Sequence, residues 1–149
     1  MIRKWQTLVF LSWDDKLLLL QAFLLLPLVA LLLQTWGMRR TQSILAWLSY
    51  HLISETSEAK FSQITKTTRI VQIAVRHSPY WTNCLRKSLV LWFLLRRQGI
   101  DSELRIGVRR EQDKFEAHAW IEYEGRVLND NQNVRQQFAM FEHPIEVKR

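Results

Sequence analysis

The spacing of apolar and polar residues predicts a helical N-terminal half. Apolar residues dominate positions 4–13 and 16–35, and the second of these segments is apolar on nearly every side. Gly37, followed closely by two arginines, is typical of the end of such a helix. A further helix is predicted at residues 59–77, where isoleucines recur at helical spacing until Pro79 ends the pattern.

Another helix is predicted directly afterwards, and it carries the only cysteine of the chain. Thr82 or Asn83 is placed to cap it, and apolar residues recur at helical spacing from Cys84 to Gln98. Gly99 follows as the expected C-terminal stop. The cysteine is therefore expected in the first turn.

The remainder of the chain predicts a small antiparallel sheet. Apolar and polar residues alternate in several short segments, and Glu124-Gly125 provides a tight hairpin turn between two of them. The expected strands are residues 103–108, 115–123, 126–128 and 138–141. Helices followed by such a sheet are typical of the α+β class. We predict a core at residues 57–149, preceded by a leucine-rich helical extension at residues 1–56.

The apolar segment at residues 17–33 has two interpretations. It is interrupted only by Gln21 and Pro27, whereas a membrane-spanning helix needs about 20 apolar residues. Aspartates precede it and no small-residue cleavage site follows, so we expect a cytoplasmic protein without a secretory signal. We favour burial in a helical hairpin or docking of a partner, and association with a membrane surface is the alternative.

The composition narrows the classes of function. The chain has 21 lysines and arginines against 14 aspartates and glutamates, a formal net charge of +7, which attracts anionic partners without selecting among them. No basic run, RNA-stacking aromatic signature or zinc finger is present, so nucleic-acid binding is not predicted. A single cysteine excludes an internal disulfide framework, and no histidine motif has metal-ligand spacing. We therefore expect no metal and no cofactor.

Cys84 is a candidate nucleophile because of its place at a helix start. Unpaired backbone N–H groups and the positive end of the helix dipole favour a thiolate there, and the thiolate is the nucleophilic form. The backbone N–H of Cys84 is also placed to stabilise an oxyanion. Trp81 is an alternative donor for this purpose, or a wall of the substrate cleft. A small buried residue that only packs is the simpler interpretation of a lone cysteine.

His118 and Asp130 are the partners that a cysteine nucleophile needs. Alternation places His118 on one strand face between two alanines, where its ring is accessible as a general base. The predicted hairpin brings Asp130 back towards His118, where its carboxylate can orient the imidazole. Asn129 is the alternative for that role. The three residue types together predict a triad of Cys84, His118 and Asp130.

These residues lie in motifs that resemble a known family. The segments CLRKSLVLWFLLRRQGI, LRIGV, AHAW and GRVLND are similar to those of the transglutaminase-like cysteine peptidases of lasso peptide biosynthesis. The resemblance covers about residues 60–131 and extends more loosely into the leucine-rich helices. It implies a papain- or transglutaminase-like core in which Cys84, His118 and Asp130 form the catalytic triad.

The resemblance also implies a reaction and its partners. Proteins of this family remove the leader from a ribosomally made precursor peptide through a thioester on the cysteine, often just after a threonine at the penultimate leader position. The core peptide then passes to an ATP-dependent cyclase. We expect the split form of the family, in which a separate winged-helix protein recognises the leader, because the first half of this chain is predicted to be helical. An acyl or amide transferase of the same fold and a non-enzymatic, membrane-associated adaptor are the alternatives.

Overall fold

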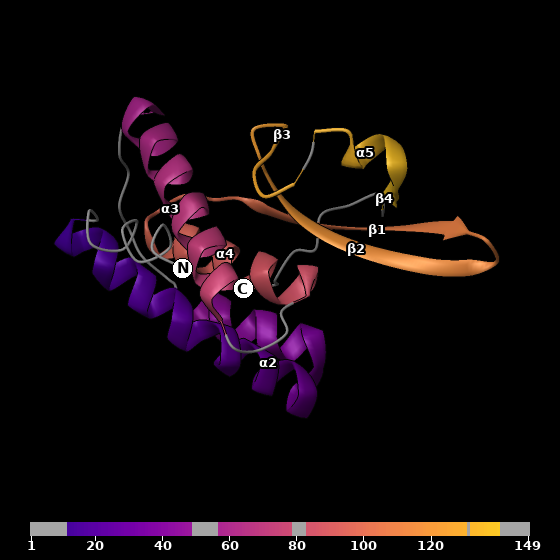
Figure 1. Cartoon of the computed structure of the whole chain (residues 1–149), viewed down its shortest axis with the longest axis horizontal. Helices are drawn as coiled ribbons and strands as arrows, with labels where there is room; N and C mark the ends of the chain where they lie inside the picture. Colours follow the sequence, from indigo (N-terminus) through magenta and orange to yellow (C-terminus); the bar gives the residue numbers. More distant parts are fainter. Residues whose placement is uncertain (1–11, 49–56, 79–82, 131, 141–149) are drawn as a thin grey trace.

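The structure, a computed structural model, describes residues 12–48, 57–78, 83–130 and 132–140 (Figure 1). Its elements are α2 (Trp13–Leu48), α3 (Ser57–His77), α4 (Cys84–Arg97), β1 (Glu103–Glu111), β2 (Lys114–Tyr123), β3 (Arg126–Val127), α5 (Val134–Gln137) and β4 (Ala139–Met140). Helices precede the sheet along the chain, which confirms the predicted α+β class. The helix expected at residues 4–13 falls almost wholly outside the described residues.

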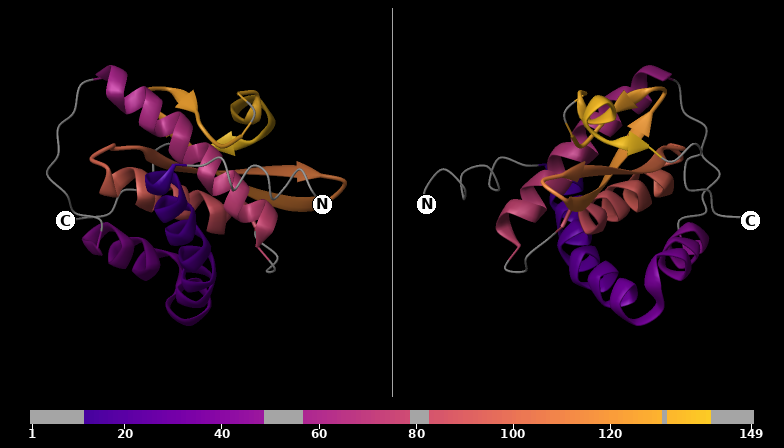
Figure 2. Two further views of the ribbon diagram at one scale, coloured as in Figure 1. Left: turned by 60° about the vertical axis from the view of Figure 1, so that its left-hand side comes forward. Right: turned by 90° about the vertical axis from the view of Figure 1, so that its right-hand side faces the viewer.

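Helix α2 bends at Gly37. This glycine has φ 76°, in the left-handed region, so it interrupts the helical geometry before the helix resumes and continues to Leu48. The Thr41 hydroxyl, one turn into the second arm, donates to the Gly37 carbonyl at 2.7 Å. The predicted stop at Gly37 coincides with this kink, where the first helical arm ends and a second arm follows directly (Figure 2).

Helix α4 is the central element of the core. Asn83 caps it, as its Oδ1 accepts from the backbone N–H of Arg86 at 2.9 Å, whereas Thr82 lies outside the described residues. Every residue from Ser88 to Leu95 is buried, because α4 packs against α2, α3 and β2. The sequence predicted one apolar stripe, whereas the helix is covered on all sides over two turns.

The four-stranded antiparallel sheet has the order β3-β2-β1-β4. Strands β1 and β2 form a long hairpin, whose register places Gly107 opposite His118. Glu124 and Gly125 have φ 47° and 79°, which gives the predicted two-residue turn between β2 and β3. Strand β3 ends after two residues, and the Gln132 side-chain amide then pairs with both backbone groups of Val127, at 3.2 and 2.7 Å.

The two faces of the sheet pack against different elements. Ala119 and Ile121 belong to the main core together with the residues of α4, whereas Trp120 points to the opposite side. There it forms a second cluster with Val127, Val134 and Phe138. In Figure 2, α2 and α4 lie on one side of the hairpin, while α5 lies on the other. The short helix α5 was not predicted.

The apolar segment of α2 is buried on one side only. Its buried residues are Leu19, Ala22, Leu26 and Val29, which share the main core with α4. Its exposed leucines are Leu17, Leu20, Leu24, Leu28 and Leu31, with 44–64% of each side chain accessible. The first helix therefore contributes to the same core as residues 57–140, and the predicted boundary adjoins residues 49–56, which lie outside the described part of the chain.

Candidate active site

Cys84 is the first residue of α4 and is partly accessible. The Asn83 side chain occupies one of the free backbone donors of the first turn, and no acidic residue lies in that turn. The local field at the helix start is therefore positive, and it favours a negative charge on the sulfur or on an oxygen bound next to it.

The start of α4 is fixed to β2 by a network around Ser88, one helical turn after Cys84. The Ser88 hydroxyl donates to the Ala119 carbonyl at 3.2 Å and accepts from the Asn129 amide nitrogen at 2.9 Å. The Asn129 Oδ1 accepts in turn from the backbone N–H of Ile121 at 2.8 Å. Two of these three contacts use backbone groups of β2, at Ala119 and Ile121, and the third links Asn129 to Ser88, so α4 approaches the strand beside His118.

The His118 imidazole Nε2 is hydrogen-bonded to the Asp130 carboxylate Oδ2. Both side chains are about three-quarters buried, with 23% and 26% of their surface exposed. Because Nε2 is held by Asp130, Nδ1 is the ring nitrogen left to exchange a proton with a substrate or a thiol.

Pairing along β2 explains how Asp130 reaches His118. Val127 lies opposite Glu122, and the backbone N–H of Leu128 donates to the Ile121 carbonyl at 2.8 Å. The Asn129 side chain then accepts from the backbone N–H of Ile121 at the strand edge. This contact brings the next residue, Asp130, level with His118. Of the two residues that the sequence offered as the imidazole partner, Asp130 makes the contact and Asn129 fixes α4 to β2.

The His118 ring stacks on two aromatic residues that the sequence analysis did not assign to the site. The Phe138 ring lies 5.0 Å away at an interplanar angle of 21°, and the Trp120 ring lies 6.1 Å away at 29°. The Arg109 guanidinium lies 4.7 Å from the centre of the Phe138 ring. These contacts restrict the rotation of the imidazole and hold it towards Asp130.

Gly107 leaves room for this aromatic wall. It pairs with His118 in the β1–β2 register, and a Cβ at this position would lie 2.8 Å from the Phe138 Cβ and 2.9 Å from the Trp120 Cη2. A side chain larger than hydrogen would therefore displace a ring that contacts His118. A glycine in the middle of an alternating strand is the sequence signal that could have indicated this close approach.

A buried carboxylate fixes Trp120 from the other side. The Trp120 indole N–H donates to the Glu122 Oε1 at 2.9 Å, and Arg105 Nε lies 3.3 Å from the Glu122 Oε2. Glu122 is only 1% exposed, so its buried carboxylate is stabilised by its contacts with both Trp120 and Arg105. The chain Arg105–Glu122–Trp120 thus supports the wall against which the imidazole packs.

His118 and Asp130 contact each other directly. Cys84 is positioned relative to this pair by the contacts of α4 with β2. Within the described ranges, no hydrogen bond joins the Cys84 sulfur to the His118 ring. Trp81 lies outside the described residues. Within those same ranges, no group of three or more histidine, cysteine, aspartate or glutamate side chains is placed to hold a metal ion.

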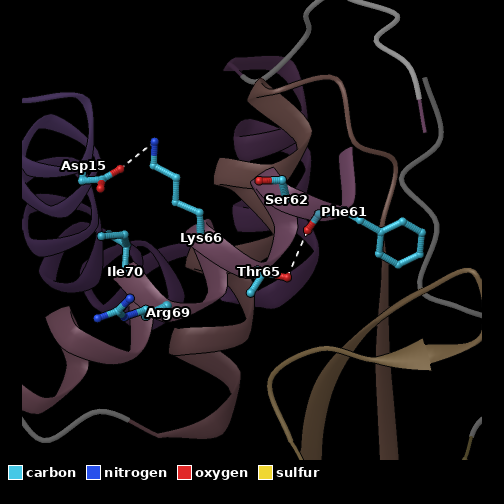
Figure 3. A pocket seen from close by; sticks show the side chains of 7 residues that line it. All are labelled: Asp15, Phe61, Ser62, Thr65, Lys66, Arg69 and Ile70. Carbon is cyan, nitrogen blue, oxygen red and sulfur yellow. Dashed lines mark hydrogen bonds and ion pairs between the residues drawn. The ribbon is translucent and has the colours of Figure 1, made fainter. Parts of the chain in front are cut away.

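A separate depression of about 460 Å³ lies between α2 and α3 (Figure 3). It is lined by Asp15, Phe61, Ser62, Thr65, Lys66, Arg69 and Ile70. Lys66 points to Asp15, with 2.6 Å between Nζ and Oδ1, so their charges compensate each other. The lining includes none of the three predicted catalytic residues.

Comparison with known proteins defines the class of this chain. Residues 28–142 match the transglutaminase-like superfamily, so the chain belongs to this superfamily. The match confirms the predicted transglutaminase-like core, and it begins within α2, in the leucine-rich part of the chain.

The resemblance to lasso peptide processing proteins also has a counterpart among known proteins. The chain is 37% identical over 59 residues to the microcin J25-processing protein McjB of Escherichia coli. The matched segment covers 40% of this chain and 27% of that protein, so the chain spans about a quarter of the length of its relative. No solved structure matches the chain.

Proposed function

We propose that this chain is a cysteine peptidase that removes the leader from a ribosomally made lasso precursor peptide. The observation that carries the proposal is the His118–Asp130 hydrogen bond on the strand edge against which the cysteine-bearing helix α4 is fixed. The similarity to a microcin-processing protein supports the choice of a precursor peptide as substrate.

In the proposed mechanism, Cys84, His118 and Asp130 act as a triad. The Cys84 thiol gives its proton to Nδ1 of His118, and the sulfur attacks the carbonyl carbon at the leader–core junction. The backbone N–H of Cys84 stabilises the resulting oxyanion, with Trp81 as a further donor or cleft wall. The C–N bond breaks as the imidazolium protonates the leaving amine, which frees the core peptide and leaves the leader as a thioester.

Hydrolysis then regenerates the enzyme. Water gives a proton to His118 while its oxygen attacks the thioester carbonyl, and the C–S bond breaks to release the leader carboxylate and the Cys84 thiol. Asp130 holds the imidazole through Nε2 in both half-reactions. The scheme uses neither a metal nor a cofactor.

The proposal includes partners and a location. A separate winged-helix protein would present the leader, and an ATP-dependent cyclase would receive the freed core. Supply of ATP and a free thiol both suit the cytoplasm, where thiols are kept reduced. The core amine released by the cleavage is the group that such a cyclase condenses with an acidic side chain.

The proposal is tested by mass spectrometry of a neighbouring-gene precursor incubated with the full chain, with and without the recognition protein. We expect free leader and free core from the wild type, and neither from Cys84→Ala. Adding hydroxylamine should convert part of the leader to its hydroxamate, because it intercepts the thioester. Transfer of the leader to an amine instead of water would identify an acyl transferase, and binding without any cleavage would identify an adaptor.

A further inference from the structure

The exposed side of α2 is a continuous apolar surface. At 100° per residue, Trp13, Leu17, Leu20, Leu24, Leu28 and Leu31 fall within an arc of about 80°, and all are 44–80% exposed. The buried residues of the same arm lie on the opposite side. We call these six exposed residues the leucine face. From Leu17 to Leu31 it extends over about 21 Å.

The absence of charge distinguishes the leucine face from a helix-pairing seam. Between Lys16 and Arg39 the sequence has no charged residue, and the positions flanking the face include Gln21, Pro27 and Leu32. Helices that pair in water carry charged residues beside the apolar seam, which set the partner and the register. A broad face without such charges fits a lipid environment better than a second helix.

Residues that membrane interfaces favour lie near the two ends of the first arm of α2. Trp13 lies at the N-terminal end of the leucine face and is 80% exposed, whereas Trp36 is 52% exposed and points about 120° away from the centre of the face. Lys16, Arg39 and Arg40 are exposed beside them, whereas Asp15 is paired with Lys66 and Asp14 is the one exposed carboxylate of the first turn. Indole rings settle at the headgroup level, and the excess of cations complements anionic lipids.

The packing of α2 determines how it would meet a membrane. Residues 13–48 are long and apolar enough to cross a bilayer by length and composition, and only 22% of the most apolar 18-residue window is buried. However, the inner side of the first arm packs in the main core through residues such as Ala22 and Val29, which are fully buried. The helix can therefore lie in the interface plane without leaving the core.

We propose that the leucine face binds the surface of an anionic phospholipid bilayer, with the first arm of α2 parallel to the membrane and the main core outside the hydrocarbon. The excess of cations near the ends of the first arm, the Trp13 indole and the uncharged flanks of the leucine face favour a lipid surface over a second helix. The proposal is independent of the peptidase assignment, because Cys84, His118 and Asp130 are not part of the leucine face.

The test is flotation of the full chain with vesicles of phosphatidylcholine alone and of phosphatidylcholine with a quarter phosphatidylglycerol. We expect the wild type and Cys84→Ala to float equally with the anionic vesicles, and high salt to weaken the binding. The triple variant Leu20→Gln, Leu24→Gln, Leu28→Gln should bind at least tenfold more weakly, since it removes the central apolar contacts. Phe115→Gln is the matched control, because Phe115 is 79% exposed at the far end of the β1–β2 hairpin.

A charge variant tests the proposal without altering the leucines. Arg39→Gln with Arg40→Gln should weaken binding to the anionic vesicles by about fivefold per arginine and leave binding to neutral vesicles unchanged. Flotation of the triple variant at the wild-type level would overturn the proposal, as would a wild type that remains unbound with both vesicles. Light scattering that shows a wild-type dimer, converted to a monomer by the triple variant without any vesicle binding, would assign the face to a second copy.

Discussion

The two faces of β2 differ in the kind of side chain they carry, so substitutions on them should affect different properties of the protein. One face packs Ala119 and Ile121 against α4 in the main core, where the side chains are apolar and complementary in shape. The other face carries His118, Trp120 and Glu122, each of which has a specific polar or stacking partner. Substitutions on the packing face should therefore lower mainly the free energy of unfolding, and substitutions on the polar face should lower mainly the rate of cleavage.

The largest effect is expected from His118→Ala on the polar face. Removing the imidazole should lower leader cleavage by about 10⁴-fold, since triad members act as a unit, while the free energy of unfolding changes little for a side chain at the cluster rim. Single-turnover cleavage and urea unfolding measure the two quantities. Cleavage within tenfold of the wild type would exclude His118 as the general base.

The matched substitution on the packing face is Ile121→Ala. Ile121 is fully buried, so its truncation should lower the free energy of unfolding by about 2–5 kcal/mol and leave the cleavage rate per folded molecule close to that of the wild type. A large loss of activity at a temperature where the variant is fully folded would show that the two faces are not separable.

Adjacent residues after β3 allow the same comparison at the strand edge. Asp130→Ala should lower cleavage by roughly 10²- to 10³-fold, because the imidazole loses its orienting carboxylate, with little change in stability. Asn129→Ala should instead lower the free energy of unfolding by about 1–3 kcal/mol, because it leaves the Ile121 N–H without its acceptor. If Asn129→Ala stops cleavage while Asp130→Ala is harmless, the two roles must be exchanged.

Local patterns predicted much of the fold, and long-range contacts account for most of the differences. The cap at Asn83, the turn at Glu124-Gly125 and the alternation around His118 each depend on a few neighbouring residues, so they could be read from the sequence. Gly37 ends the first arm of α2 as its local signal predicted, but that signal is the same whether the chain leaves the helix or begins a second arm.

The supporting contacts of the site could not be predicted in the same way. Phe138 is 20 residues from His118, and its stacking depends on where β4 joins the edge of β1. The pairing of Asp130 with His118 followed from one hairpin, whereas the link from Asn129 through Ser88 to Ala119 joins three separate elements. Only packing of the whole chain brings such residues together.

The smallest effects are expected at two glycines, where alanine substitution tests the lack of space at one position and the positive φ angle at the other. Gly107→Ala should lower the free energy of unfolding by about 1–3 kcal/mol, because the new methyl group would contact Phe138 and Trp120 within 2.9 Å. Gly125→Ala has open space around it but φ 79°, so it should cost about 1 kcal/mol through strain alone. Only Gly107→Ala displaces rings that contact His118, so only this variant should also lower cleavage per folded molecule. Near-UV circular dichroism measures the displacement of the rings, and single-turnover kinetics measures the cleavage. Equal cleavage by the two variants would show that the aromatic wall stabilises the sheet without positioning the imidazole.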